Sequence, residues 1–281
     1  MEVKIDPSKI KIESSKPPVV SQDMAIKSTL SKIKKKIAVM SGKGGVGKTT
    51  VSVNLAVALA QSGLKVGILD ADITGPNIPL MIGLEGESVT VQDQKIIPGE
   101  KYGVKVVSME LLVNARTPLI WRGPLKVAAI KQFLSDVYWG DLDVLIIDLP
   151  PGTSDEPLSI IQIIPEIAGA VIVATPQEVA LLDVKKAVEF AKRTNMPILG
   201  VIENMSSIAC PHCGKEIDIF GKGGARSLAE DLGIPFLGDI PLDVEARKMG
   251  DQGKPPVIVQ DSPFGAAFHP IVHKLRQQIG L

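Results

Sequence analysis

The chain has 281 residues, and its 31 basic and 31 acidic side chains balance to a formal net charge of zero at pH 7. This balance argues against a protein that binds nucleic acid or anionic lipid through its overall field. No apolar run approaches the roughly 20 residues that span a bilayer, and the N-terminus lacks the apolar stretch of a signal peptide, so we expect a cytoplasmic protein.

Residues 1–36 differ in composition from the rest of the chain. They hold nine lysines against four acidic residues, lack glycine and show little apolar periodicity. Such a composition is typical of a solvated tail. We therefore expect a flexible basic arm over 1–36, followed by a single domain over 37–281.

Beyond the arm, short apolar runs alternate with helix-like segments. The expected strands are residues 36–41, 65–70, 143–148, 168–175 and 198–204. Nearly continuous Val, Ile and Leu suits strands that are buried on both faces, as in a parallel sheet with helical crossovers. Helices are expected over residues 48–61, 124–139, 154–164, 179–194, 224–232 and 264–279. The pattern predicts an α/β fold with a mostly parallel, twisted sheet and helices on both faces. Period-two alternation in 89–99 and 104–109 also predicts a small hairpin near an edge.

The segment MSGKGGVGKTT, residues 40–50, completes the phosphate-loop pattern G-x-x-x-x-G-K-[ST]. It follows an expected strand and precedes an expected helix, as the pattern requires. Glycines let backbone N–H groups converge on phosphate oxygens, Lys48 neutralises the β and γ phosphates, and the Thr49 hydroxyl can bind Mg²⁺. The residues expected to hold the nucleotide are Gly42, Lys43, Gly44, Gly45, Val46, Gly47, Lys48, Thr49 and Thr50.

Polar side chains follow the ends of three expected strands. Asp148 lies in LIIDLPPG, where a carboxylate can hold Mg²⁺ directly or through water. The segment 150–153 that follows can change conformation with the γ-phosphate, as switch loops do. Asp70 and Asp72 end a second run, and Asn204 ends a third. Asp72 and Asn204 also suit turns, so that simpler interpretation stays open.

Cys210 and Cys213 form a C-x-x-C pair in CPHCG, within a predicted metal loop at 205–220. In a reducing compartment this spacing indicates metal or redox chemistry more than a structural disulfide. Tetrahedral thiolate sites take four sulfurs, so one chain supplies half and a two-fold dimer would supply the rest. Zn²⁺ would use the same ligands. A thioredoxin-like redox pair is a further alternative, although Pro211 and Gly214 favour a rubredoxin-like turn.

GKGGVGKTT resembles the deviant Walker A motif of the MinD/ParA, nitrogenase iron-protein and Mrp group of dimeric P-loop ATPases. The resemblance implies that Lys43, the additional lysine, reaches across a two-fold interface to the partner's phosphates. It also implies that Asp72 orients the attacking water, that Asp70 supports Mg²⁺ indirectly, and that Asn204 reads the purine edge of ATP. A solvent-exposed lysine beside a glycine turn is the simpler interpretation of Lys43.

Over about residues 37–280, the loop together with DADITGPNIP, WRGP, DLPPGTSD, NMS, CPHCG and IPLD resembles the Mrp/ApbC family of iron–sulfur cluster carrier ATPases. This resemblance implies a homodimer that holds a [4Fe-4S] cluster on Cys210 and Cys213 of both chains. It also implies delivery to apo iron–sulfur proteins, with slow ATP hydrolysis linked to transfer. The sequence departs from relatives that carry an N-terminal cysteine cluster or a preceding small α/β domain, and no role is assigned to Arg122.

A positioning ATPase of the MinD or ParA kind, acting on membrane or DNA, is the alternative function. It gives CPHC no use, and the C-terminal FHPIVHKLRQQIGL has so few cations that a packed terminal helix is expected there. Electron transfer in the manner of nitrogenase iron protein would need two well-separated ligand cysteines per chain. The segment GKGGARS, residues 221–227, lacks the second Gly-Lys-Thr and is expected to open a helix. The sequence therefore favours a cluster carrier without nucleic-acid or membrane partners.

Overall fold

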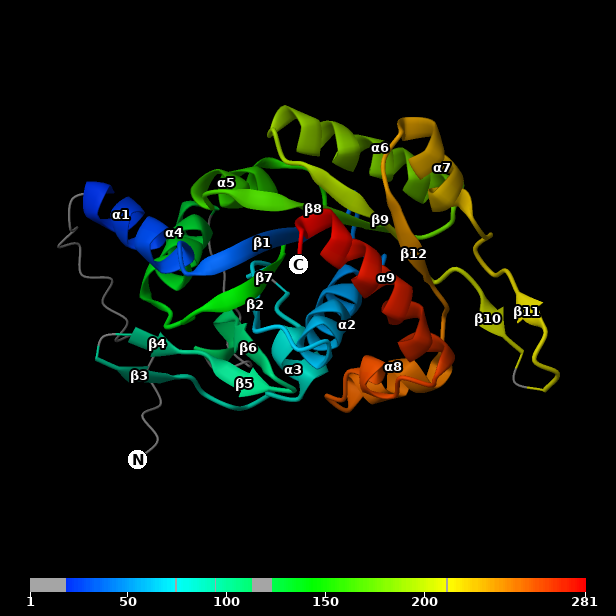
Figure 1. Cartoon of the computed structure of the whole chain (residues 1–281), viewed down its shortest axis with the longest axis horizontal. Coiled ribbons are helices and arrows are strands. Elements are labelled where there is room, and N and C mark those ends of the chain that lie inside the picture. The colour runs from blue at the N-terminus through cyan, green and yellow to red at the C-terminus, as the bar shows by residue number, and fades with distance from the viewer. Residues whose placement is uncertain (1–18, 74, 94, 113–122, 211) are drawn as a thin grey trace.

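The computed structural model describes residues 19–281 except 74, 94, 113–122 and 211. In this part of the chain, the central sheet has eight strands in the order β12-β9-β8-β1-β7-β2-β6-β5 (Figure 1). Neighbouring strands are parallel except β5, which runs antiparallel to β6 at one edge. The predicted mostly parallel sheet is confirmed. Its strands are β1 (Ile33–Met40), β2 (Val66–Asp70), β5 (Gly99–Lys101), β6 (Val104–Val107), β7 (Leu142–Asp148), β8 (Ile167–Ala174), β9 (Ile198–Asn204) and β12 (Phe236–Ile240).

Helices cover both faces of the sheet, and each layer encloses its own hydrophobic core. One layer contains α1 (Val19–Leu30), α4 (Gly123–Asp136), α5 (Asp155–Ile163), α6 (Glu178–Arg193) and α7 (Gly224–Leu232). The other contains α2 (Lys48–Gln61), α3 (Ile78–Ile82), α8 (Val244–Asp251), α9 (Pro263–Ile279) and the 3₁₀ turn η3 (Pro256–Ile258). A second 3₁₀ turn, η2 (Met109–Leu111), follows β6. The predicted α/β fold with helices on both faces is confirmed.

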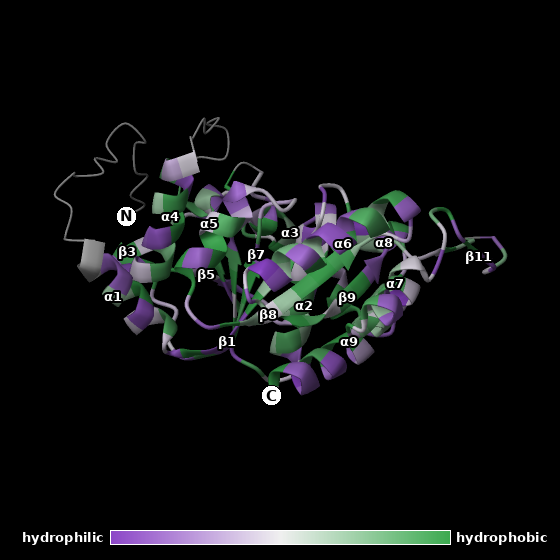
Figure 2. Cartoon of the chain, turned by 90° about the horizontal axis from the view of Figure 1, so that it is seen from above, coloured by the Kyte–Doolittle hydropathy of each residue, from purple (hydrophilic) through white to green (hydrophobic). Residues whose placement is uncertain are grey.

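The strands are apolar throughout because successive side chains enter opposite cores. In β1, Ala38 and Met40 lie in the core beneath α4 to α7, whereas Ile37 and Val39 lie in the core beneath α2 and α9. Figure 2 shows the same arrangement as hydrophobic strands between outer helices that carry both colours. Nearly continuous apolar runs therefore mark strands that are covered on both sides.

Most predicted helices agree with the structure. α2 and α7 have the predicted bounds, and α4, α5, α6 and α9 agree to within three residues at each end. Phe264, Phe268 and Leu275 of α9 are buried, which confirms the packed terminal helix. The sequence pattern misses α3, α8 and β12, since α8 is largely polar and β12, FLGDI, is interrupted by glycine and aspartate.

The predicted flexible arm over 1–36 is wrong in its second half. α1 begins at Val19, and its Ile26 and Leu30 are buried in the same core as α4. β1 begins at Ile33, so the boundary at residue 37 falls inside a strand. Two buried side chains one helical turn apart are enough to dock a short helix, but too few to give the sequence a clear apolar period. Residues 1–18 of the predicted arm lie outside the described residues.

The predicted hairpin over 89–99 and 104–109 is two separate pairs. β3 (Thr90–Gln92) and β4 (Lys95–Ile97) form an antiparallel pair of their own. β5 and β6 form the second antiparallel pair, and β6 also pairs in parallel with β2. The edge position is confirmed for β5, but β6 is an internal strand of the main sheet, which local alternation does not reveal.

Candidate nucleotide-binding site and cysteine hairpin

The phosphate-loop segment leaves β1 at the carboxyl edge of the sheet and leads into α2. Gly45 and Gly47 have φ angles of 82° and 79°, a region that favours glycine. A Cβ atom on Gly47 would lie 2.2 Å from Nδ2 of Asn204, and one on Gly42 would lie 2.3 Å from the backbone oxygen of Asp183. The N-cap of α2 is Gly47, which has no side chain to cap the first turn, so the N–H groups there suit an anionic ligand.

Asp148, which is fully buried at the end of β7, is surrounded by three polar side chains from α2. Thr49 donates from Oγ1 to Oδ2 at 2.7 Å, and Ser52 donates from Oγ to Oδ1 at 2.6 Å. Lys48 Nζ lies 2.8 Å from Oδ2, yet this buried ammonium has no aligned hydrogen bond within the described residues. The structure therefore brings together the predicted Lys48, Thr49 and Asp148. The motif does not identify Ser52, although it lies one helical turn after Lys48.

Asp70 is the partner of Asp148 in the register of β2 and β7, which places the two carboxylates on neighbouring strands. Burial raises the pKa of Asp70 well above its usual value, and the negative charge of Asp148 raises it further. Ser108, which is fully buried, donates to Oδ2 of Asp70 at 3.3 Å. Asp70 therefore lies next to Asp148, with a hydroxyl partner that the sequence does not reveal, and its indirect support of Mg²⁺ stays a prediction.

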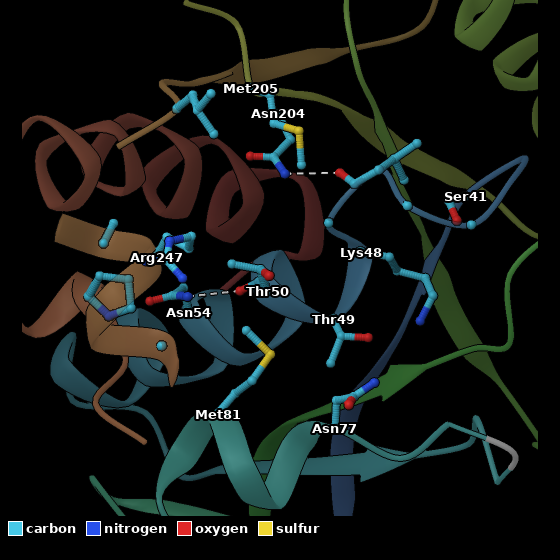
Figure 3. Close-up of a pocket in the computed structure, with 18 of the residues that line it drawn as sticks. Ser41, Lys48, Thr49, Thr50, Asn54, Asn77, Met81, Asn204, Met205 and Arg247 are labelled. Atoms are coloured by element: carbon cyan, nitrogen blue, oxygen red, sulfur yellow. Dashed lines mark hydrogen bonds between the residues drawn. The ribbon is translucent and has the colours of Figure 1, made fainter. Parts of the chain in front are cut away.

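The phosphate loop and residues of α2, α3, α8 and α9 line a cavity of about 500 Å³. Figure 3 shows Asn204 and Met205 on one side of it, with Met81 and Asn77 on the other. Asn204 is buried and donates from Nδ2 to the backbone oxygen of Val46 at 2.9 Å, so the predicted base-reading side chain contacts the phosphate loop. The lining includes Lys43, Gly44, Gly45, Val46, Gly47, Lys48, Thr49, Thr50, Asp72, Asn204, Leu242 and Arg247.

Lys43 and Asp72 both line this cavity. Lys43 is half-buried, and its backbone oxygen accepts a 2.8 Å hydrogen bond from Ser41 Oγ. Asp72 accepts a 3.3 Å bond from the N–H of Gly75, so it does shape a turn, as the simpler interpretation of this residue predicts. It shapes that turn at the cavity, which is also where a water-positioning carboxylate would have to lie. Gly42 packs against α6 instead and does not line the cavity.

Cys210 and Cys213 lie in a small hairpin formed by β10 (Ile208–Ala209) and β11 (Glu216–Ile217), inside the predicted metal loop. Figure 1 shows this hairpin projecting from the body of the molecule beside β12. Cys210 is half-exposed and Cys213 is exposed. The backbone N–H groups of His212 and Cys213, together with the thiol of Cys213, hold the pKa of Cys210 below its usual value. Both thiols are therefore accessible, and the turn favours the thiolate form that binds metals.

Within the described residues, no group of three or more His, Cys, Asp or Glu side chains is arranged to hold a metal ion. The cysteine pair thus has no further ligand of these types from its own described chain. The half-site shared between two chains stays a prediction. The predicted helix-opening segment 221–227 is confirmed, because α7 begins at Gly224 after Gly223, whose φ is 77°.

A family model described as a ParA-type NUBPL iron-transfer P-loop NTPase matches residues 32–276. An iron-sulfur cluster carrier protein of Methanocaldococcus jannaschii is 52% identical over 275 residues, covering 97% of this chain and 94% of that protein. A nucleotide-binding protein of Archaeoglobus fulgidus, solved in complex with ADP, has a TM-score of 0.74 and 46% identity over 83% of this chain and 91% of its own. The cell division ATPase MinD of Pyrococcus furiosus is more distant, with a TM-score of 0.65 and 26% identity over 87% of this chain and 99% of its own.

Proposed function

Because this chain belongs to the ParA-type NUBPL iron-transfer P-loop NTPases, we propose that it is an ATP-hydrolysing carrier that assembles a [4Fe-4S] cluster across a homodimer and transfers it to apo iron–sulfur proteins. Relatives named as iron-sulfur cluster carriers are about half identical over nearly the whole chain. The observation that carries the proposal is the exposed hairpin with two thiols per chain, half the number that a cluster takes.

ATP fits the cavity because the start of α2 offers uncapped backbone N–H groups together with the Lys48 ammonium. The buried ammonium of Lys48 has no aligned acceptor within the described residues, and phosphate oxygens would supply one. In the proposed complex, the side chain of Asn204 contacts the purine base of ATP. The proposed role of Lys43 is to reach the phosphates bound by the second copy. Binding of ATP would then favour the dimer.

Mg²⁺ fits the oxygen atoms of Thr49 and Asp148, which lie 2.7 Å apart at the floor of the loop. When bound there, the ion neutralises charge that develops on the phosphates. Ser52 keeps the second oxygen of Asp148 occupied, and so it fixes which oxygen faces the loop. Asp72, at the cavity, is the proposed group that orients the attacking water, and positioning of this kind is sufficient for slow hydrolysis.

The cluster is proposed to be cargo on Cys210 and Cys213 of both chains. Two copies related by a two-fold axis present the hairpin twice, which completes the four thiolates. Zn²⁺ would be bound by the same atoms, so the metal itself has to be measured. The proposed partners are a second copy of the chain and apo-proteins that accept the cluster, without nucleic acid or membrane.

The positioning ATPase stays the alternative, and the distant likeness to MinD supports a shared fold. No described helix is long and apolar enough to cross a membrane. α9 buries its apolar face inside the protein, so it offers little for a membrane surface. We therefore rank the carrier first.

Anaerobic reconstitution with ferrous iron and sulfide tests the proposal. We expect about four irons per dimer and the brown absorbance of a [4Fe-4S] cluster. Cys210→Ser should abolish both, while the matched hairpin variant His212→Ala should retain them. Loss of the absorbance on incubation with an apo-acceptor, together with gain of acceptor activity, tests transfer. A cofactor-free dimer that pellets with vesicles or DNA would overturn the carrier in favour of the positioning ATPase.

A further inference from the structure

The cysteine hairpin is inserted between Asn204, which lines the nucleotide cavity, and the start of α7. It follows Asn204, whose side chain is hydrogen-bonded to Val46 in the phosphate loop. It ends shortly before Gly223, which precedes the first residue of α7. Figure 1 shows the hairpin on the chain between the end of β9 and the start of α7. The contacts that join the end of β9 to the start of α7 therefore set the orientation of the hairpin relative to the rest of the molecule.

Glu203 holds them together. Its side chain is 1% exposed, and its two oxygens accept 2.8 Å hydrogen bonds from the backbone N–H groups of Gly223 and Ala225. Within the described residues no cation pairs with it, so the start of α7 is what stabilises the buried carboxylate. Glu203, which is next to Asn204, therefore bonds to residues 20 and 22 positions later, and these bonds fix the point where the chain leaves the hairpin.

A second set of contacts ties the base of the hairpin to the same region. Glu216 of β11 accepts from Ser207 Oγ at 2.5 Å and from Lys222 Nζ at 2.6 Å, and these two residues flank the hairpin. The N–H of Leu242, a residue that lines the cavity, donates to the backbone oxygen of Ser207 at 2.7 Å. The hairpin base therefore contacts one cavity residue, Leu242, through Ser207.

We propose that Glu203 is a positioning residue that transmits the nucleotide state of the phosphate loop to Cys210 and Cys213. A change in the loop on ATP binding acts on Asn204 through its bond to Val46, and Glu203 is the adjacent residue of β9. Because both of its oxygens hold the start of α7, the entry and the exit of the hairpin move together. The inference rests on the proposed function in taking ATP as the ligand of the cavity, but it needs no cluster.

The test measures thiol reactivity in the reduced, metal-free full-length chain. The rate of modification of Cys210 and Cys213 by an aromatic disulfide reagent is compared without nucleotide, with Mg-ADP and with Mg-ATP. In the wild type we expect Mg-ATP to change the rate by at least about fivefold, the lower end of the usual coupling between two sites. Glu203→Gln keeps the size of the side chain but presents an amide N–H₂ to one of the two donors. We expect it to bind ATP within about twofold of the wild type while losing the effect of ATP on the thiols.

Ser262→Ala is the matched control, because the Ser262 side chain caps α9 through bonds with Val259 and Gly265 and bonds to no described residue of the hairpin. It should keep the full effect of ATP. If Glu203→Gln does not fold, Lys222→Met is the deciding variant. It removes the exposed ion pair between Lys222 and Glu216 at the base of the hairpin, and it should at least halve the effect of ATP on the thiol reaction rate. A wild type that binds ATP without any change in thiol rate overturns the inference, as does an unchanged effect in the deciding variant. A wild type that does not bind ATP contradicts the proposed function itself and overturns the inference with it.

Discussion

Ser52 and Asp148 share a 2.6 Å hydrogen bond in which neither residue is exposed. The bond joins α2 to the end of β7 and occupies the carboxylate oxygen that Thr49 does not contact. The orientation of Asp148 is therefore fixed from two successive turns of one helix. The phosphate-loop motif specifies one of these contacts, and the structure adds the other.

Removing the hydroxyl of Ser52 should weaken hydrolysis, because it frees the Asp148 carboxylate to turn. In Ser52→Ala, Oδ1 of Asp148 loses its donor, and bonds to charged groups contribute about 1.5–3 kcal/mol. We expect a loss of roughly tenfold or more in hydrolysis rate and a higher Mg²⁺ requirement. Titration of activity with Mg²⁺ checks this. Ser62→Ala is the control, since Ser62 donates only within its own helix end, to Leu59. An unchanged Mg²⁺ dependence in Ser52→Ala would show that Thr49 alone orients the carboxylate.

Lys43 and Lys48 should separate binding from hydrolysis. If Lys43 serves the partner's phosphates, Lys43→Ala keeps ATP affinity in the monomer but lowers the hydrolysis rate by about 10²–10³, the usual cost of one lost electrostatic stabiliser. Lys48→Ala, which removes the buried ammonium, should lose both. Equilibrium binding at low protein concentration and hydrolysis at high concentration measure the two quantities. Equal loss of both in Lys43→Ala would contradict the cross-chain role.

Gly45 and Gly47 form a matched pair for the contact between the loop and Asn204. Both have positive φ, so alanine costs backbone strain of about 1–2 kcal/mol at each. Only at Gly47 would the new Cβ meet Asn204, at 2.2 Å from Nδ2, while at Gly45 it meets nothing within 4 Å. We expect Gly47→Ala to lose far more ATP affinity than Gly45→Ala, as calorimetric titration would show. Similar losses would mean that strain alone decides.

Motifs in the sequence predict the phosphate loop well because its chemistry is local. Gly47, Lys48 and Thr49 are adjacent, and the strand before them and helix after them have clear patterns. The sequence does not predict the contacts of Ser52 and Glu203, because their partners lie 96 and about 20 residues away along the chain. Those contacts depend on which helix packs against the end of which strand, and a periodic pattern does not specify this.

The docked N-terminal helix offers a direct check on the corrected arm. Leu30 of α1 is fully buried, whereas Met24 on the same helix is 66% exposed. Leu30→Ala should lower the free energy of unfolding by about 2–5 kcal/mol, the range for deleting a buried leucine. Met24→Ala should change it by less than about 0.5 kcal/mol. Denaturant unfolding measures both. Two variants of equal stability to the wild type would restore the flexible arm over this segment.

Asp143, near the amino-terminal end of β7, should make the stability of the fold depend on pH. Lys34 Nζ donates to Oδ1 at 2.8 Å and the N–H of Lys65 donates to Oδ2 at 2.8 Å; these bonds, with Lys34 first, hold the pKa of Asp143 below its usual value. An acid whose folded pKa is lowered stabilises the fold above its unfolded value of about 3.9. That contribution is lost as the pH falls through the folded value. Because Lys34 is 66% exposed, solvent screening limits the effect.

At pH 7, Asp143→Asn should therefore lower the free energy of unfolding by about 0.5–1 kcal/mol. The difference from the wild type should shrink steadily below about pH 4, because the wild-type carboxylate then takes up the proton that the amide lacks. Urea unfolding at a series of pH values checks both statements. Asp141→Asn, which removes an exposed carboxylate two residues earlier, should leave the profile unchanged. A difference that grows towards acid pH would mean that the carboxylate destabilises the fold.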